Sequence, residues 1–187
     1  MNLKIIKFKR VKSTNDQAIN LIQKHRYDSG LVISDSQVKG RGTMGKKWIS
    51  KKGNIFISIF FKVNFNKYKI ENFLKINAEI IRKVLKCYTK KIITIKKPND
   101  LLIEKKKFCG ILQEVISHNN EKYLITGVGI NTINAPKDNK LVSTCLSEHS
   151  KKIIKNLKII INIKIAYEKM ISDLNNNNFK YIKNKNI

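Results

Sequence analysis

Residues 40–48 combine glycine, positive charge and a tryptophan in a way that suits the binding of a phosphate-bearing ligand. Glycines let the backbone approach a bound molecule closely, and the side chains of Arg41 and Lys46 can meet anionic oxygens. Trp48 offers a flat face on which a nucleotide base can stack. The segment is not a P-loop, because no Gly-Lys-Ser/Thr sequence closes it. Taken alone, a mobile basic surface loop with Trp48 packed in the core is an equally good interpretation.

Asn99 and Asp100 are a second candidate group, at the predicted end of a strand and just after Lys96 and Pro98. Their side-chain oxygens suit Mg²⁺ or a water molecule bound to phosphate. Pro98 fixes its own backbone and biases the preceding residue towards extended geometry. A Pro-Asn-Asp turn without any ligand is the simpler interpretation when this segment is taken by itself.

Lys107 leads into an apolar segment that is predicted to be a strand. Regular alternation places Phe108, Gly110 and Leu112 on one face of this strand, with Lys107 and Cys109 on the other. A lysine at this position can enter a pocket and neutralise a buried anion, although a solvated lysine at a strand end is the commoner case.

Gly127 and Gly129 stand two residues apart in another apolar segment. Glycine within a strand marks either the close approach of a ligand or of another backbone, or a β-bulge. Both interpretations stay open for this pair.

Alternating strand and helix patterns predict a mixed sheet flanked by helices, in a single domain that spans residues 1–187. Strands are expected over residues 3–11, 31–34, 54–63, 92–96, 108–117 and 122–131, the last two as an antiparallel pair joined by a polar turn. Ser13 or Thr14 can cap a first helix, and further helices are expected over residues 70–88 and 157–174. Residues 37–53 are expected to form a loop, and the tail beyond residues 175–178 is expected to fray.

The formal net charge of +26 indicates either a polyanion-binding protein or a general bias in composition. Lysines are spread along the whole chain, and the few arginines are Arg10, Arg26, Arg41 and Arg82. This distribution favours compositional bias, with weak non-specific binding to polyanions as a by-product. The odd number of widely spaced cysteines predicts a reducing cytoplasmic environment, and neither a signal peptide nor a membrane span is expected.

In this order, the segments resemble the catalytic domain of biotin–protein ligases. The resemblance covers roughly residues 3–147 and is carried by Ser13-Thr14-Asn15, Gln37, Gly40-Arg41-Gly42 through Gly45 to Trp48, Lys96 with Pro98-Asn99-Asp100, Lys107 with Gly110-Ile111-Leu112 and Glu114, and Gly127 to Asn131. It implies an α+β fold with a mixed, largely antiparallel central sheet flanked by helices. It also implies a biotin–[acetyl-CoA-carboxylase] ligase activity with ATP, Mg²⁺ and biotin, in which biotin is converted to biotinyl-adenylate and then passed to a lysine of a biotin carboxyl carrier protein.

The same resemblance implies a role for each residue of the candidate site. The side chains that would hold the ureido ring of biotin are Ser13, Thr14, Asn15 and Gln37. The residues that would fold over biotin and the adenylate are Gly40, Arg41, Gly42 and Thr43. The catalytic pair would be Lys107, bridging the carboxylate and the α-phosphate, and Arg41. Lys46 would bind phosphate, and Trp48 would stack on adenine. Asn99 and Asn131 would help to place the nucleotide, and Gly110 would also be a ligand-binding residue. Asn99 and Asp100 are the predicted Mg²⁺ ligands.

The sequence departs from the resemblance at two positions and at both ends. Thr43 stands where a second arginine is usual, which predicts weaker retention of the adenylate, and Lys97 stands where tryptophan usually precedes Pro98. The match starts almost at Met1, and the sequence after the last predicted helix is too short for a further small domain. We therefore expect no N-terminal DNA-binding domain, no specific DNA binding and no C-terminal small β-barrel.

The resemblance leaves the oligomeric state open between monomer and homodimer. Two other functions also stay open: a lipoate–protein ligase-like enzyme and a non-catalytic, basic nucleic-acid-binding protein.

Overall fold

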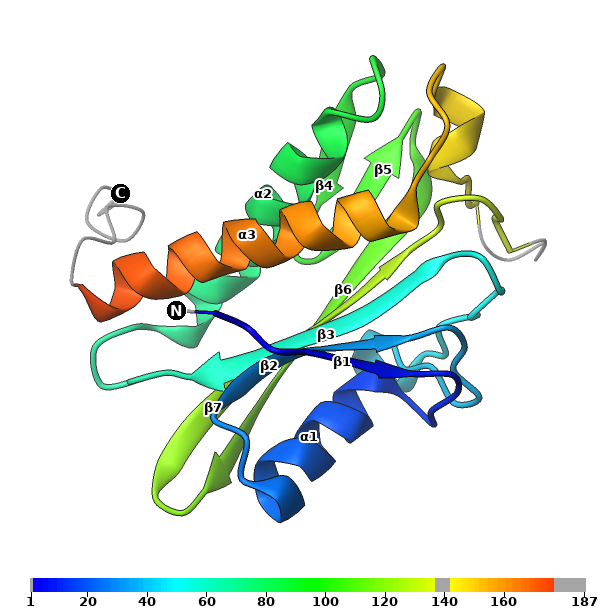
Figure 1. Ribbon diagram of the computed structural model, residues 1–187. Helices are drawn as coiled ribbons and strands as arrows, with labels where there is room; N and C mark the ends of the chain where they lie inside the picture. Colours follow the sequence, from blue (N-terminus) through cyan, green and yellow to red (C-terminus); the bar gives the residue numbers. More distant parts are fainter. Residues whose placement is uncertain (1, 137–141, 177–187) are drawn as a thin grey trace.

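The computed structural model describes residues 2–136 and 142–176. Within these residues, one mixed sheet holds seven strands in the order β1-β2-β3-β7-β6-β5-β4 (Figure 1). The strands are β1 (Ile5–Phe8), β2 (Ser29–Ser34), β3 (Ile55–Lys62), β4 (Ile93–Lys96), β5 (Asp100–Ile103), β6 (Lys106–His118) and β7 (Glu121–Ile130). β1 and β2 are parallel, and all other neighbouring pairs are antiparallel. The expected mixed, largely antiparallel sheet is confirmed. The predicted C-terminal tail lies outside the described residues.

Helices cover both faces of this sheet (Figure 1). α1 (Thr14–His25) packs on one face around a small core that includes Ile22 and Phe60. α2 (Ile70–Lys86) and α3 (Asn156–Asn175) pack on the opposite face around a larger core. Two short 3-10 segments, Thr43–Gly45 and Leu146–His149, complete the regular structure of the described residues.

The central strand β3 is apolar because it is buried on both faces. Ile57 and Ile59 point into the larger core, whereas Phe60 points into the core under α1. Ser58 interrupts the apolar run and donates a hydrogen bond from Oγ to Oδ1 of Asn15, 2.5 Å away. The strand thereby fixes the first turn of α1 over the sheet.

The sequence patterns missed one strand. β5 is short, and it is joined to β6 by a tight turn in which Glu104 and Lys105 both adopt positive φ, 50° and 64°. Such turns usually contain glycine or asparagine, as does the correctly expected turn at Asn119 and Asn120. Because Glu104 and Lys105 give no turn signal, the sequence patterns indicated no hairpin here and assigned residues 97–107 to no helix or strand.

A β-bulge also corrects the predicted orientation of Lys107. Leu101 pairs with Cys109 while Leu102 pairs with Lys107, so Phe108 is an extra residue in β6. The alternation therefore restarts after the bulge, and Lys107 lies on the same side as Gly110. A Cβ built on Gly110 would lie 3.3 Å from Nζ of Lys107. The expectation that these two residues occupy opposite faces is wrong.

Candidate active site

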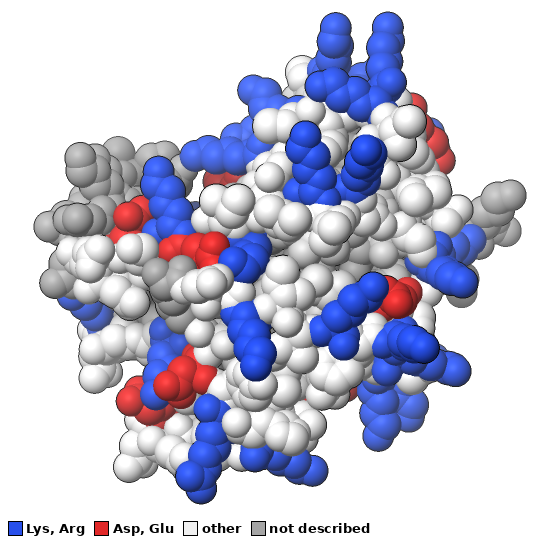
Figure 2. Space-filling model, viewed as in Figure 1, with Lys and Arg blue, Asp and Glu red and all other residues white. Residues whose placement is uncertain are grey.

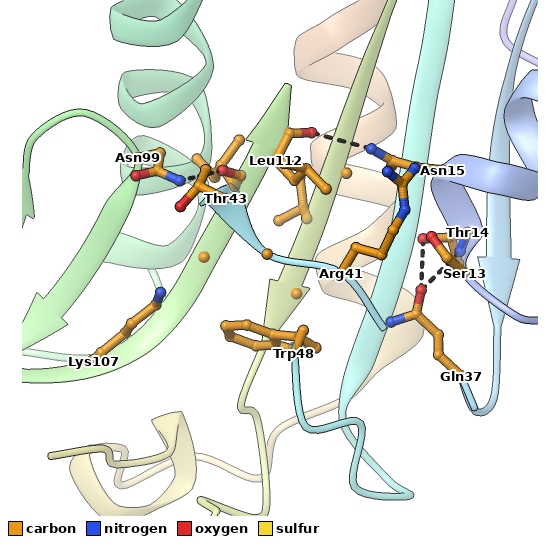
Figure 3. Close-up of a pocket in the computed structure, with 16 residues that line it drawn as sticks. Ser13, Thr14, Asn15, Gln37, Arg41, Thr43, Trp48, Asn99, Lys107 and Leu112 are labelled. Carbon is orange, nitrogen blue, oxygen red and sulfur yellow. Dashed lines mark hydrogen bonds between the residues drawn. The ribbon is translucent and has the colours of Figure 1, made fainter. Parts of the chain in front are cut away.

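The N-terminus of α1 forms a polar wall. Ser13 is the N-cap residue, and its hydroxyl accepts a hydrogen bond from the Asp16 N–H. The backbone N–H and the hydroxyl of Thr14 both donate to Oε1 of Gln37, at 2.7 and 3.1 Å. The amide nitrogen of Gln37 donates to the Ser50 hydroxyl at 3.0 Å. These bonds fix the orientation of the Gln37 amide, and Figure 3 shows the two bonds between Gln37 and Thr14.

Asn15 extends the wall inwards and is buried. Besides accepting from Ser58, it donates from Nδ2 to Oε2 of Glu114 at 2.7 Å and to the carbonyl of Leu112 at 3.4 Å. Its side chain lies against Gly127, where an added Cβ would overlap the Asn15 amide. Gly127 is thus a site of close approach, and the continuous β3–β7 and β6–β7 registers at this point contain no bulge.

The strands below provide a glycine floor for Trp48. Cβ atoms built on Gly110 and Gly129 would lie 2.8 and 2.5 Å from atoms of the indole, so only glycine allows the ring to lie there. Trp48 is half-buried, and among the described residues its indole N–H is buried without a hydrogen-bond partner. A buried donor without an acceptor is unfavourable, by about 1–3 kcal/mol. A bound ligand could supply the missing acceptor.

Two adjoining cavities meet at Trp48. The first has a volume of ≈ 40 Å³, enough for a few water molecules. Its lining consists of Ser13, Thr14, Asn15, Gln37, Arg41, Gly42, Thr43, Trp48, Asn99, Lys107, Gly110, Ile111, Leu112, Gly127, Val128 and Gly129. The second has a volume of ≈ 510 Å³ and is lined by Gly42, Thr43, Lys46, Lys47, Trp48, Ile49, Lys107, Pro136, Val142 and Ser143. Gly42, Thr43, Trp48 and Lys107 therefore belong to both cavities.

Lys107 is the cation at this border. Its ammonium lies 2.7 Å from Oδ1 of Asp100 and 5.4 Å from the centroid of the Trp48 ring. Its backbone N–H donates to the Val142 carbonyl, and its carbonyl accepts from Thr144. The neighbouring Cys109 is fully buried, and burial raises the pKa of its thiol, so this cysteine stays neutral and is no candidate nucleophile.

Arg41 lies on the opposite wall and is ion-paired. Its guanidinium donates two hydrogen bonds to the carboxylate of Glu114, at 2.8 and 2.7 Å, and contacts Oδ1 of Asp16 at 2.8 Å. Partial burial lowers the pKa of Arg41, but the hydrogen bonds and negative charges of Glu114 and Asp16 raise it by more. Figure 3 shows the Arg41 side chain pointing towards Asn15 and away from Lys107.

Most of the residues predicted for the site line the first cavity, and four do not. Lys46 lines only the second cavity. Gly40 packs against the carbonyl of Trp48 at the base of the loop. Asn131 is buried behind the site, where its amide bonds to Asn54 and Thr144. Asp100 reaches the site through its ion pair with Lys107.

The sequence analysis gave several lining residues no role in binding, although they belong to the segments that carry the resemblance. These residues are Ile111, Leu112, Gly127, Val128 and Gly129. The two-residue spacing of Gly127 and Gly129 was the available signal, because it places both glycines on one face of a strand. Of the two partners of Arg41, Glu114 belonged to the resemblance without a stated role, and Asp16 gave no local signal.

Of the two predicted Mg²⁺ ligands, Asn99 lines the first cavity and Asp100 is paired with Lys107. The Asn99 amide donates to the Ile111 carbonyl at 2.7 Å, which leaves its oxygen as the group that can bind a cation. Among the described residues, here or elsewhere, no group of three or more His, Cys, Asp or Glu side chains is arranged to hold a metal ion. No helix among the described residues has the length and apolar character needed to cross a membrane.

The fold is that of a known class of ligase. The model of the Biotin/lipoate A/B protein ligase family matches residues 7–131, and the chain belongs to this family.

Similar proteins include the bifunctional ligase/repressor BirA of Bacillus spizizenii, which is 30% identical over 179 residues covering 92% of this chain and 55% of the relative. The chain thus spans about half the length of this curated relative.

Among solved structures, the chain is similar to the biotin protein ligase from Aquifex aeolicus in complex with biotin and ATP. The TM-score is 0.77 and the identity 25%, with 96% of this chain and 75% of the other covered. It is similar as well to the biotin protein ligase from Leishmania major in complex with biotinyl-5-AMP. That match has a TM-score of 0.75 and 25% identity, and covers 92% of this chain and 75% of the other.

Proposed function

We propose that this chain is an ATP-dependent biotin–protein ligase that forms biotinyl-adenylate and transfers biotin to one lysine of a biotin carboxyl carrier protein of acetyl-CoA carboxylase. The observation that carries the proposal is the position of Lys107 at the border of two adjoining cavities. A reaction between a carboxylate held in one cavity and a phosphate held in the other takes place beside this ammonium. The relatives described above, which bind biotin with ATP or biotinyl-5-AMP, support the same assignment.

The first cavity suits the ureido ring of biotin. The ring presents two N–H donors and one carbonyl acceptor, and the wall made by Ser13, Thr14, Asn15 and Gln37 offers hydroxyl and amide groups that can meet them. The dithiolane ring of lipoate has no comparable donors or acceptors, so the polar wall favours biotin over lipoate.

The second cavity suits the nucleotide. Lys46 and Lys47 provide positive charge for phosphate oxygens, and Trp48 provides an aromatic face for adenine. Asn99 and Asp100 fit a Mg²⁺ ion only together with phosphate oxygens, because the two side chains cannot complete a coordination shell. When bound, the ion would withdraw charge from the phosphates.

In the proposed mechanism, Lys107 acts through the positive charge of its ammonium group, and no residue of the chain acts as a nucleophile. The biotin carboxylate attacks the α-phosphorus of ATP, and pyrophosphate leaves as the mixed anhydride forms. The ammonium of Lys107 screens the two approaching anions and stabilises the negative charge that builds between them. The amine of the carrier lysine then attacks the anhydride carbonyl, and AMP leaves. Burial keeps Cys109 neutral and out of the reaction.

Two further properties belong to the proposal. Basic side chains are scattered over the face seen in Figure 2, with acidic ones between them, which supports compositional bias over a dedicated nucleic-acid surface. Cys87, Cys109 and Cys145 are all unpaired, which supports a reducing compartment such as the cytoplasm.

The deciding experiment is ATP–pyrophosphate exchange with purified protein and Mg²⁺, run in parallel with biotin and with lipoate. Biotin-dependent exchange, followed by labelling of a single lysine in a carrier domain, is the expected result. Exchange with lipoate alone would assign the chain to lipoate chemistry. Salt-sensitive DNA binding without exchange with either acid would favour the non-catalytic alternative.

A further inference from the structure

Ser58 is a buried hydroxyl on the central strand that the proposed mechanism does not use. It interrupts the apolar run of β3, and its side chain is fully buried. It is not among the residues that line the two cavities. Its hydroxyl donates a hydrogen bond to Oδ1 of Asn15 in the first turn of α1. Because a serine hydroxyl carries one proton, this bond commits the donor of Ser58 to Asn15.

The amide of Asn15 lies across three strands of the sheet. Ser58 on β3, Gly127 on β7 and Leu112 on β6 are register partners in one row. The amide accepts from Ser58 at one end of this row and donates to the Leu112 carbonyl at the other. Between these ends it lies against Gly127, where an added Cβ would be only 3.0 Å from Cγ of Asn15. The lack of a side chain at Gly127 therefore lets Asn15 approach the sheet.

The hydrogen bonds also fix which way this amide points. Nδ2 of Asn15 has two N–H donors, and they meet the Leu112 carbonyl and the Oε2 atom of Glu114. Oδ1 accepts from the hydroxyl of Ser58. A flipped amide would place its oxygen against a carbonyl and a carboxylate, which cannot donate. Ser58 thus completes a set of bonds that allows one orientation of Asn15.

Asn15 is directly joined to the residues that form the wall of the first cavity. Ser13 and Thr14 line this cavity and are the N-cap and the first residue of α1. One peptide bond separates Thr14 from Asn15, so the height of Asn15 above Gly127 sets the position of both side chains. The two hydrogen bonds from Thr14 to Gln37 extend this position to the rest of the wall.

We propose that Ser58 is a positioning residue for the biotin site: through the amide of Asn15, it holds the N-terminus of α1 at the distance from the sheet that the ureido ring requires. The consequence for biotin rests on the proposed function, whereas the hold on α1 does not. Loss of the hydroxyl would leave Oδ1 of Asn15 buried without a donor, which is unfavourable. The first turn of α1 would then be held less firmly. Biotin would bind less tightly, while the chemistry at Lys107 would continue.

Amide hydrogen exchange in the first turn of α1 tests the hold of Ser58 directly and needs no substrate. The Asp16 and Gln17 amides report on this turn, because they donate to the hydroxyl and the carbonyl of Ser13. We expect Ser58→Ala to speed hydrogen exchange at both amides about tenfold, since local opening governs the rate. Native rates at both amides in this variant would overturn the proposal.

Thr126→Val is the matched control, on the strand next to β3. Thr126 is also fully buried, and its hydroxyl accepts a hydrogen bond from Nδ2 of Asn77 at 3.1 Å. It faces the other side of the sheet, because its register partner Ile59 points into the larger core. The variant thus also removes a buried bond between a hydroxyl and an amide. It should leave both hydrogen exchange in the first turn of α1 and the KM for biotin at native values. Equal changes in the two variants would overturn the specific role of Ser58.

Steady-state kinetics of biotin-dependent ATP–pyrophosphate exchange test the consequence for biotin. Ser58→Ala should raise the KM for biotin about tenfold and leave kcat within about twofold, because it weakens binding and not the chemical step. A fall of kcat with unchanged KM would overturn the positioning role. If thermal unfolding shows that Ser58→Ala folds poorly, Ser58→Cys replaces it in both assays. Cysteine is similar in shape but offers only a weak S–H donor, so the same changes are expected.

A double variant tests whether Ser58 acts through Asn15. Asn15→Ala should itself raise the KM for biotin, and adding Ser58→Ala should raise it no further, because the two residues share one interaction. Effects that multiply in the double variant would show that Ser58 acts by another route, and would overturn the proposal. If the native chain shows no biotin-dependent ATP–pyrophosphate exchange, the proposed function fails. The hydrogen-exchange result still decides whether Ser58 holds α1.

Discussion

The ammonium of Lys107 and the carboxylate of Asp100 lie 2.7 Å apart where the two cavities meet. Asp100 is thus the anion that the ammonium of Lys107 contacts. An incoming carboxylate or phosphate must compete with Asp100 for this ammonium. The ion pair with Asp100 holds the ammonium of Lys107 at the border of the two cavities. This position leads to the first prediction.

Replacing Lys107 by alanine should lower the rate of biotin adenylation at least about a hundredfold, corresponding to roughly 3 kcal/mol for an oriented donor to a developing anion. Thermal unfolding should change little, since the lysine buries no large apolar surface. ATP–pyrophosphate exchange measures the effect. Lys106→Ala, at an exposed neighbouring position outside both cavities, is the control. A near-native rate for Lys107→Ala would remove this residue from the reaction.

Trp48 should report nucleotide binding through its fluorescence. Its indole N–H is buried without an acceptor, and its ring lines both cavities, so ATP with biotin should quench or shift the emission. As the single tryptophan, it gives an unmixed signal, and Trp48→Phe provides the blank. Unchanged emission at saturating ligand, with binding shown by calorimetry, would mean that Trp48 never contacts the nucleotide.

Thr43 should make the enzyme release its intermediate. It lines both cavities with one hydroxyl, at a position where the resemblance places a second arginine with several donors. Escaped biotinyl-adenylate would acylate exposed lysines, so we expect self-biotinylation and labelling of bystander proteins. Thr43→Arg should reduce both, and hydroxylamine trapping in a single turnover can time the release. Equal release rates for the native chain and the variant would show that nearby lysines already compensate.

Gly129→Ala should displace Trp48 and loosen the glycine-rich loop of residues 40–48, called the flap. The added Cβ would lie 2.5 Å from the indole, and the backbone of β7 cannot move away, since it is paired on both sides. We expect faster trypsin cleavage within residues 40–48 and a KM for biotin raised about tenfold. Ile125→Val, in the core under α1, should cost about 0.5–1.5 kcal/mol of stability and leave the flap unchanged. Native flap cleavage in Gly129→Ala would argue that Trp48 has another resting place.

The sequence predicted well where a local pattern carries the information. The apolar run of β3 and the Ser13 cap of α1 each leave a periodic or capping signal, and both were found. β5 was missed because two residues without turn preference adopt positive φ, and the Phe108 bulge inverted the predicted side of Lys107. The pairing of Arg41 with Glu114 joins segments far apart in the chain. Such a contact leaves no spacing to detect and emerges only when the sheet is assembled.

The apolar strand β3 has a consequence for how the chain folds as it is synthesised. Its partner β2 has already emerged when β3 appears, but its other neighbour, β7, follows only after the whole of residues 63–120. Until then, one edge of a long hydrophobic strand stays open to pairing with other chains, which is how aggregation begins. Lys62 stands at the end of the run, where a charge discourages such pairing. Slower translation of residues 63–120, between β3 and β7, should therefore lower the yield of folded protein. The same delay placed after β7 should lower the yield less.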